Sequence, residues 1–280
     1  MVTDVVGTGS PTEYAHDDGL LLSLRGISKS FGAVQALRDV NFDVVPGKVT
    51  ALVGDNGAGK STLIKTISGI WQPSEGEMFW KGKPANVRTP RDADALGIAT
   101  VYQDLALCDN LDIVQNMYLG HEELRFHLLD ENKMEITARQ VLTDLSVTTV
   151  QSIRQPVGSL SGGQRQAVAV ARAVMRDAQL VVMDEPTAAL GVSQTAQVLD
   201  LIRRLASRSI AVLVISHNLN DVFAVADRIA VLRLGHLVSS GPVENYDTQS
   251  TVELITTGTL NGVAADSGTD AKGAGSDPEG

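Results

Sequence analysis

Residues 54–61 read GDNGAGKS and fit the phosphate-loop pattern G-x-x-x-x-G-K-S/T. An apolar run at 49–53 precedes them and a helix-like stretch at 62–70 follows, so a strand, a loop and a helix follow one another as this motif requires. The glycines let backbone N–H groups wrap round a phosphate at the positive end of the helix, Lys60 reaches the outer phosphates, and Ser61 offers a hydroxyl to Mg²⁺. The sequence therefore predicts a nucleoside triphosphate site. Its binding residues are Gly54, Asp55, Asn56, Gly57, Ala58, Gly59, Lys60, Ser61 and Thr62.

Two carboxylates follow a second apolar run. Residues 180–183 read LVVM and lead directly into Asp184 and Glu185. Open α/β sheets bind ligands at the carboxyl ends of their strands, so we expect both side chains to face the phosphate loop. Asp184 suits Mg²⁺, and Glu185 is placed to polarise a water molecule for in-line attack on the γ-phosphate. A solvated turn is the alternative, but the phosphate loop upstream favours the catalytic interpretation.

A serine and two glycines at the start of a predicted helix form a second candidate phosphate site. Residues 160–164 read LSGGQ, and the helical pattern continues to 176. Exposed N–H groups and the positive end of the helix dipole favour an anion there. The alternative is that the serine only caps the helix and the glycines make its turn. The residues of this site are Leu160, Ser161, Gly162, Gly163 and Gln164.

These motifs, in this order, resemble the ATP-binding subunits of ATP-binding-cassette (ABC) transporters, whose signature sequence residues 160–164 match. The resemblance covers about residues 20–258 and implies ATP and Mg²⁺ as ligands. It also implies that Gln103 contacts Mg²⁺ or water and senses the membrane partner, that His217 bonds the γ-phosphate, and that Phe31 packs against adenine. A surface glutamine, a structural histidine and a core phenylalanine are the alternatives for these three residues.

One loop departs from the family pattern. After Glu185, Pro186 and Thr187 the family commonly has Ser-Ala-Leu-Asp, whereas residues 188–191 of this chain read AALG. In the family this loop crosses the dimer interface, so the missing aspartate puts the strength of communication between the two ATP sites in doubt. The AALG loop, the GDNGAGKS loop and the sequence ISHN at 215–218 together resemble the branch that energises bacterial uptake of monosaccharides of the ribose, xylose and fructose type.

The bulk composition is that of a globular α/β protein, with 43% apolar and 20% charged residues among 280. A net charge of −10 and the lack of a basic stripe argue against a nucleic-acid-binding surface. The single cysteine, Cys108, excludes an intrachain disulfide and agrees with a reducing compartment. No apolar run approaches the ~20 residues that span a bilayer, and residues 1–19 do not resemble a signal peptide. We therefore expect a cytoplasmic protein, and the resemblance implies that it is peripheral on the inner face of the cell membrane.

The fold that these patterns predict is α/β, with an antiparallel β subdomain and an inserted helical subdomain, and the resemblance implies a P-loop NTPase of the ABC nucleotide-binding type. Strand patterns at 20–27 and 40–45 and a hairpin end at 79–83 predict the antiparallel piece, and apolar runs at 98–102, 180–183 and 211–215 predict a parallel sheet. Helical spacing is found at 112–119, 132–145, 162–176, 192–207, 218–226 and 251–256, and a hairpin turn at Gly235-His236. We expect a disordered tail at 1–19, the nucleotide-binding domain at 20–258 with its helical subdomain at about 104–176, and a disordered acidic, glycine-rich tail at 259–280.

The resemblance implies an ATPase that dimerises head to tail and holds two ATP molecules between the Lys60 loop of one copy and the Ser161 helix of the other. It implies docking on separate permease subunits through the helical insert and the loop after Gln103, and import of a sugar delivered by a binding protein. An exporter ATPase is the main alternative. A repair ATPase would need a long coiled coil between the phosphate loop and the signature, and residues 104–159 lack sustained heptads. A translation factor of the family normally has two cassettes, and this chain has one phosphate loop.

Overall fold

The computed structural model describes residues 19–145, 147, 150, 152–260 and 263–264. A four-stranded antiparallel sheet with the order β2-β1-β4-β5 comes first. Its strands are β1 (Leu22–Phe31), β2 (Val34–Val44), β4 (Glu75–Trp80) and β5 (Lys83–Ala85). The predicted antiparallel piece is confirmed, but β1 and β2 extend further than predicted, because their outer pairs, such as Ser30 with Gln35, are polar and carry no alternating pattern.

The second sheet has six strands in the order β12-β11-β3-β10-β9-β6. Five of its strands run parallel and β12 pairs with β11 in the antiparallel sense. The strands are β3 (Val49–Val53), β6 (Ile98–Val101), β9 (Leu180–Asp184), β10 (Ala211–Ile215), β11 (Arg228–Arg233) and β12 (His236–Pro242). This confirms the predicted parallel sheet and a hairpin, whose turn is at residues 234–235 rather than at the predicted Gly235-His236, because His236 already pairs with Arg233 as the first residue of β12.

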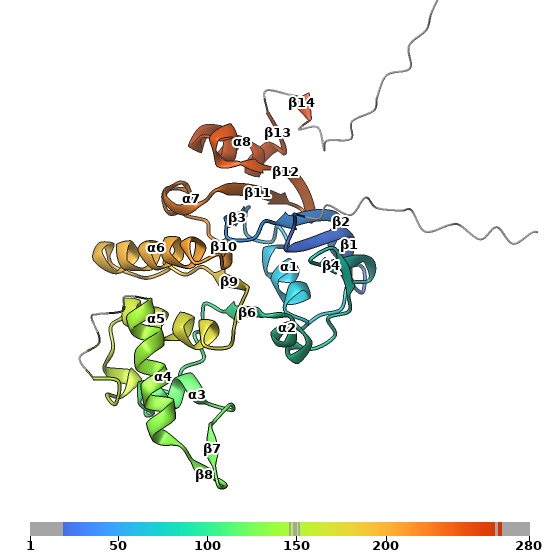
Figure 1. The fold of residues 1–280 in the computed structure, drawn as a ribbon. Helices are drawn as coiled ribbons and strands as arrows, with labels where there is room; N and C mark the ends of the chain where they lie inside the picture. Colours follow the sequence, from blue (N-terminus) through green and yellow to red (C-terminus); the bar gives the residue numbers. More distant parts are fainter. Residues whose placement is uncertain (1–18, 146, 148–149, 151, 261–262, 265–280) are drawn as a thin grey trace, which may run out of the picture.

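Helices cover both faces of this sheet (Figure 1). On one face, Leu63 and Ile67 of α1 (Lys60–Ile67) pack with Leu213 of β10. On the other face, Ile202 of α6 (Val192–Ser207) packs with Val212 of the same strand. Burial on both faces explains why the central strands are continuous apolar runs. The other helices of this body are α2 (Pro90–Leu96), α7 (Leu219–Val225) and α8 (Thr248–Thr257).

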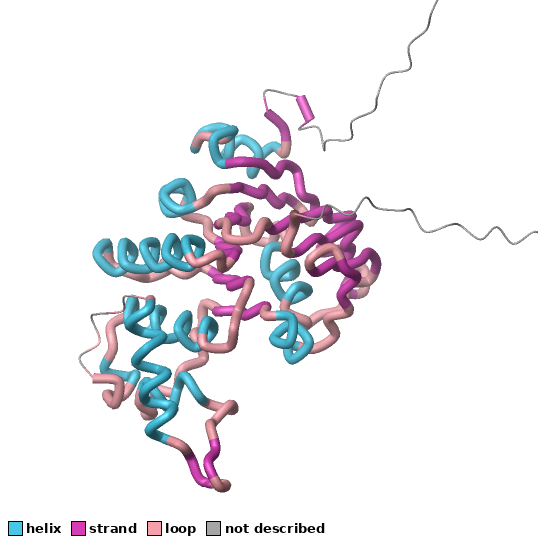
Figure 2. Tube along the Cα trace, in the orientation of Figure 1, coloured by secondary structure: helices cyan, strands magenta, loops and turns pink. Residues whose placement is uncertain are grey.

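The predicted helical insert is a separate lobe at the β6 end of the sheet (Figures 1 and 2). It contains α3 (Ile113–Tyr118), β7 (Leu124–Arg125), β8 (Leu128–Leu129), α4 (Glu131–Asp144), a 3₁₀ turn (Val157–Ser159) and α5 (Gly162–Val174). Its core includes Leu142 and Leu145 of the predicted helical segment 132–145, with Val141 partly buried against it. Helix α5 packs on α3, α4 and α6 as well as on β6 and β9, so it joins the lobe to the sheet.

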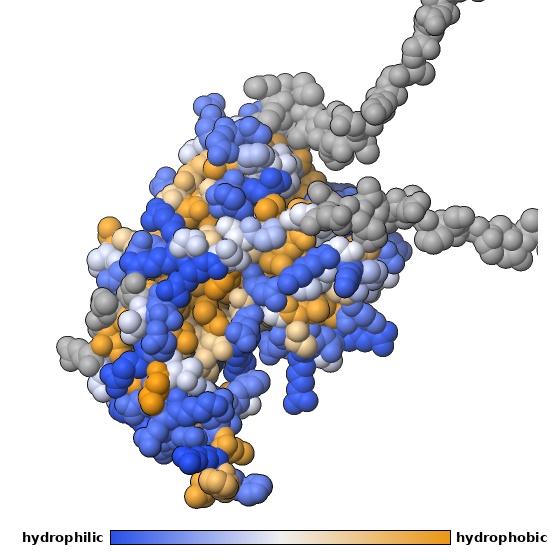
Figure 3. Space-filling model, viewed as in Figure 1, coloured by the Kyte–Doolittle hydropathy of each residue, from blue (hydrophilic) through white to orange (hydrophobic). Residues whose placement is uncertain are grey.

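Several short elements were not predicted. The β7–β8 hairpin has strands too short for a periodic signal, and its turn places Phe126 and His127 at positive φ (52° and 66°), residues that do not indicate a turn. The apolar side chains of this hairpin are exposed at the tip of the lobe and orange in Figure 3. Helix α2 begins with a capping box between Thr89 and Asp92, a signal that was present in the sequence.

The C-terminal end of the chain differs from the predicted tail where the two can be compared. Residues 1–18 of the expected N-terminal tail lie outside the described residues, as do 261–262 and 265–280 of the expected C-terminal tail. Within that second segment, β13 (Thr259–Leu260) pairs with β14 (Val263–Ala264). The limits of the nucleotide-binding domain therefore stay a prediction. Among the described residues, no helix is long and apolar enough to cross a membrane.

Candidate active site

The phosphate loop lies between β3 and α1 and is packed closely against the neighbouring backbone. Gly59 has a φ of 110°, and a Cβ atom on it would lie 2.7 Å from the carbonyl oxygen of Ala36. A Cβ atom on Gly54 would lie 2.2 Å from the carbonyl oxygen of Leu232. Only glycine fits these two positions, because a left-handed backbone and a close backbone approach both exclude a side chain. The motif glycines are therefore required by this local geometry.

Lys60 opens α1 with its ammonium group inside the loop. Its Nζ donates to the carbonyl oxygens of Gly54 at 2.7 Å and Asp55 at 2.9 Å, and the residue is only 9% exposed. Burial lowers the pKa of Lys60, while the carboxylates of Glu185, Asp55 and Asp184 act in the opposite direction. The site therefore holds a partly desolvated cation where the outer phosphates of a nucleotide would lie.

A cleft of about 290 Å³ opens over this loop. It brings the strand-end carboxylates Asp184 and Glu185, and Gln103 from the segment after β6, opposite Lys60 and Ser61. Ala36, which belongs to no motif, and Ile215, which ends the apolar run at 211–215, also line it. The described residues around the cleft are Ala36, Asp55, Asn56, Gly57, Ala58, Gly59, Lys60, Ser61, Thr62, Gln103, Asp184, Glu185 and Ile215.

Glu185 is held in an unusual backbone conformation with a φ of 49°. Its N–H donates to the carbonyl oxygen of Ile215 at 2.9 Å, and its Oε2 lies 2.9 Å from Nδ1 of His217. Burial, and then the charge of Glu185, raise the pKa of the adjacent Asp184, against the opposing effects of Lys60 and Lys65. A non-glycine residue at positive φ is found where surrounding structure fixes it. This arrangement fixes the Glu185 carboxylate over the cleft and within hydrogen-bond distance of the imidazole.

Residues 160–164 are placed apart from this cleft. Ser161 is the N-cap of α5: its Oγ accepts from the N–H of Gln164 at 3.3 Å, and its own N–H donates to Oε1 of Gln164 at 2.9 Å. The capping role foreseen as the alternative is therefore present, and Ser161 is exposed. Of the residues that the structure describes, those lining the cleft include none of this group. A single chain does not bring its two candidate phosphate sites together.

Phe31 is the last residue of β1, just before the turn to β2, and is 41% exposed. Its ring meets the ring of Trp71 edge to face, with centroids 4.7 Å apart, and Nζ of Lys29 lies 5.1 Å from its centroid. Phe31 is thus not a core residue, and the alternative interpretation of it was wrong. Trp71 was missed by sequence reasoning, because an isolated aromatic residue after a helix belongs to no motif.

The loop after Glu185 is fixed by a contact that sequence reasoning also missed. Oγ1 of Thr187 donates to Oδ2 of Asp221 on α7 at 2.7 Å. Further along the loop, Gly191 is the N-cap of α6 and has no side chain to bond with. The carboxylate that helps to hold this loop therefore comes from α7, through Asp221.

Lys60→Ala should weaken ATP binding by about tenfold or more, because it removes the buried cation that would donate charge-assisted hydrogen bonds to the phosphates. Titration with a fluorescent ATP analogue measures this. Lys48→Ala is the matched control, because Lys48 is paired with Asp227 at 3.1 Å on the protein surface. Unchanged affinity in Lys60→Ala would mean that the backbone of the loop binds the nucleotide without help from this side chain.

The chain is similar to known proteins over most of its length. Residues 37–188 match the family described as ABC transporter. The fructose import ATP-binding protein of Rhizobium meliloti is 46% identical over 84% of this chain and 94% of its own. The xylose/arabinose import ATP-binding protein of Sulfolobus acidocaldarius is 44% identical over 87% and 96%. A ribose import ATP-binding protein of Rubrobacter xylanophilus is 43% identical, and this chain spans only 45% of its length.

Solved structures show the same fold. A nucleotide-free ATP-binding cassette from an ABC transporter superposes with a TM-score of 0.73 at 27% identity, over 84% of this chain and 98% of that one. The ADP conformation of an ABC transporter cassette also gives 0.73, at 26% identity over 85% of this chain and 95% of that one. The predicted fold class is confirmed by these likenesses.

Proposed function

The chain belongs to the ABC transporter family, and we propose that it is the ATP-hydrolysing subunit that energises import of a monosaccharide through separate permease subunits. The observation that carries the ATPase activity is the single cleft in which Lys60, Asp184 and Glu185 meet beside a phosphate loop. Similarity to proteins named for the import of fructose and of xylose or arabinose, over nearly their whole length, supports the sugar class.

In the proposed reaction the phosphate loop and Lys60 hold the triphosphate of ATP. The Glu185 carboxylate polarises a water molecule whose oxygen attacks the γ-phosphorus, while the bond to the leaving oxygen of ADP breaks. The proton of the water passes to Glu185 and then to the phosphate product. His217, 2.9 Å from Glu185, orients this carboxylate and reaches the γ-phosphate. Phe31, exposed and supported by Trp71, supplies a ring for the adenine base.

The oxygen donors around the cleft fit Mg²⁺. The Ser61 hydroxyl, the Gln103 amide and the Asp184 carboxylate all line it, and Mg²⁺ commonly takes one or two carboxylates together with substrate phosphates. Within the described part of the chain, no group of three or more His, Cys, Asp and Glu side chains could hold a metal by itself. When bound there, Mg²⁺ neutralises charge on the phosphate oxygens.

The separation of residues 160–164 from the cleft supports a two-copy site. We propose a head-to-tail homodimer in which the exposed helix end at Ser161 of one copy completes the Lys60 cleft of the other. The dimer would dock on permease subunits at the inner face of the cell membrane, through the helical lobe and the segment after Gln103. A sugar-binding protein would act through the permease, and no nucleic acid takes part.

Deleting the gene should impair growth on one or a few monosaccharides at low external concentration, where active uptake limits the cell. Radiolabelled-sugar uptake across a panel of pentoses and hexoses is the measurement. Lys48→Ala should restore uptake in the deletion strain, whereas Lys60→Ala and Glu185→Gln should not. Normal uptake of every sugar, together with greater sensitivity to a toxic compound, would reassign the chain to an exporter and leave the ATPase mechanism in place.

A further inference from the structure

Residues 105–112, which we call the arm, connect the cleft to the helical lobe. The arm begins just after Gln103, which lines the cleft, and ends at Asp112, the N-cap of α3. Its backbone runs beside the residues that precede α5: the N–H of Gly158 donates to the carbonyl oxygen of Asp109 at 2.9 Å, and the N–H of Val157 to that of Leu111 at 3.0 Å. The arm therefore lies against residues 154–172, which we call the signature segment.

Arg172 of α5 holds the end of the arm nearest to Gln103. Its two terminal nitrogens donate to the carbonyl oxygens of Leu105 at 3.0 Å and Ala106 at 3.1 Å. Ala106 has a φ of 49°, so the backbone turns sharply where the guanidinium of Arg172 bonds to it. Burial, and then the nearby Arg176, lower the pKa of Arg172. Removing the guanidinium would leave two carbonyl groups without these donors.

Arg165 holds the middle of the arm. It lies seven positions before Arg172 on the same helix, about two turns, and therefore on the same face. Its Nη1 lies 3.3 Å from Oδ1 of Asp109, and its Nη2 donates to the carbonyl oxygen of Gly158 at 2.9 Å. One side chain thus bonds both the arm and the turn just before Ser161.

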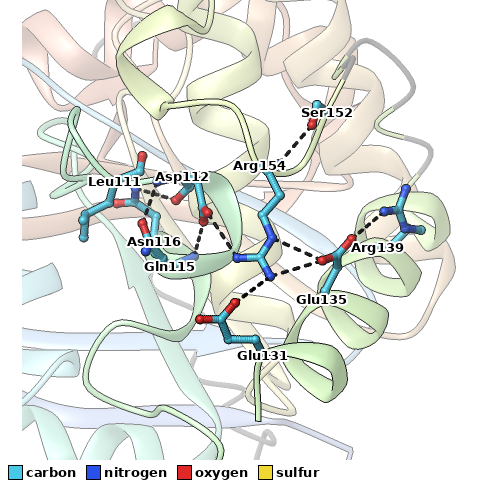
Figure 4. Close-up of polar contacts among 9 residues, drawn as sticks. All are labelled: Leu111, Asp112, Gln115, Asn116, Glu131, Glu135, Arg139, Ser152 and Arg154. Carbon is cyan, nitrogen blue, oxygen red and sulfur yellow. Dashed lines mark hydrogen bonds and ion pairs between the residues drawn. The ribbon is translucent and has the colours of Figure 1, made fainter. Parts of the chain in front are cut away.

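Arg154 holds the far end of the arm (Figure 4). Its guanidinium contacts the carboxylates of Asp112 at 3.4 Å, Glu131 at 3.2 Å and Glu135 at 3.1 Å. Because Asp112 caps α3 and the two glutamates belong to α4, this contact ties the arm to both helices. Three arginines of the signature segment thus bond the arm at its start, its middle and its end.

We propose that Arg154, Arg165 and Arg172 are positioning residues for ATP hydrolysis. They make the arm and the signature segment one body, so that Gln103 in the cleft and Ser161 at the helix end move together. This rests on the proposed function, in which Gln103 serves the ATP of its own copy and Ser161 serves the ATP of the partner. The three arginines would then couple the two ATP sites within each chain.

Cys108, the only cysteine of the chain, can report whether the arm stays in place against the signature segment. It lies in the arm and is half-buried, and Oδ1 of the fully buried Asn116 accepts from its N–H at 2.7 Å. The rate at which its thiol reacts with Ellman's reagent measures how often the arm opens. Arg172→Met, which keeps an unbranched stem and removes the donors, should raise this rate by about tenfold. Arg165→Gln and Arg154→Gln, at more exposed sites, should raise the rate of Cys108 reaction less. These two variants keep the inference testable if Arg172→Met fails to fold.

Arg139→Gln is the matched control. Arg139 belongs to the same network in Figure 4, but its guanidinium bonds Glu135 on its own helix rather than the arm. In the Arg139→Gln variant, the rate of Cys108 reaction and the rate of ATP hydrolysis should match those of the wild type. In the three positioning variants kcat should fall by up to about tenfold while KM for ATP changes by less than about twofold, because the cleft itself is intact.

Coupling is tested by adding ATP. In the wild type, ATP should change the Cys108 rate, and Gln103→Ala and Arg172→Met should each abolish that change. The inference is overturned if all three arginine variants keep the wild-type kcat and the wild-type rate of Cys108 reaction. It is also overturned if ATP still changes the rate of Cys108 reaction in Arg172→Met. Either result leaves the ATPase in place. If the wild-type chain binds no fluorescent ATP analogue, both the proposed function and the coupling are overturned. The rates at which Cys108 reacts with Ellman's reagent without nucleotide would still show whether the arginines hold the arm.

Discussion

Glu185→Gln should lower the turnover number for ATP by about 100-fold or more while leaving ATP binding intact. The amide has nearly the shape of the carboxylate and can stay beside His217, but it cannot take a proton from the attacking water. The phosphate loop and Lys60 are unchanged, so the nucleotide still binds. With hydrolysis blocked, ATP should hold two copies together in a stable dimer.

Phosphate release measures the turnover, and size-exclusion chromatography with Mg-ATP and with Mg-ADP detects the dimer. Glu123→Gln is the control, because this carboxylate pairs with Lys133 at 2.8 Å on the surface of the helical lobe. A Glu185→Gln chain that hydrolyses ATP at nearly the wild-type rate would refute the role given to Glu185.

The phosphate loop and the two carboxylates of the cleft could be predicted from the sequence because each is encoded by contiguous residues, whereas Gln103 was expected from the family resemblance and Ala36 was not predicted. The strand before the phosphate loop, the glycines that Ala36 and Leu232 crowd, and Lys60 at the helix start all lie within one short segment. Asp184 and Glu185 follow a buried parallel strand, and the carboxyl ends of parallel strands meet at one edge of a sheet. The local sequence pattern and one rule of sheet topology were therefore sufficient to predict the phosphate loop and the two carboxylates.

The contacts of the arm could not be predicted, because they join residues far apart in the chain. Arg172 meets Leu105, and Arg154 meets Asp112, only after the helical lobe has folded. An arginine on an amphipathic helix is compatible with a solvated face, so its residue type does not identify its partner. The edge-to-face contact of Phe31 with Trp71 has the same cause, because it joins the end of β1 to the segment that follows α1 much further along the chain.

The separation of Ser161 from the cleft was expected from the family resemblance rather than from the residues. The residues themselves indicate a capping box of Ser161 and Gln164 and a helix end that favours an anion, but not which copy holds the nucleotide. The exposed position of Ser161 leaves room for a nucleotide held by a second copy.

Ser161→Arg should abolish hydrolysis and leave binding of a fluorescent ATP analogue nearly unchanged, because residues 160–164 do not line the chain's own cleft among the residues described. The arginine side chain would crowd the γ-phosphate of the partner's nucleotide. Ser161→Thr is the matched control, because threonine keeps the cap of α5, whereas losing the cap alone costs about 1 kcal/mol of helix stability. The hydrolysis rate of Ser161→Thr should stay close to that of the wild type.

Mixing Ser161→Arg with Lys60→Ala decides whether the sites are shared. A mixed dimer has one site built from two intact halves and one site with both halves changed, so an equal mixture should recover about a quarter of the wild-type turnover. Native mass spectrometry confirms that mixed dimers form. If they form and stay as inactive as each parent, the two sites do not work independently. Because Gly191 has no side chain to carry a signal across the interface, that dependence would have to pass through other contacts, and the arm is the first place to look for it.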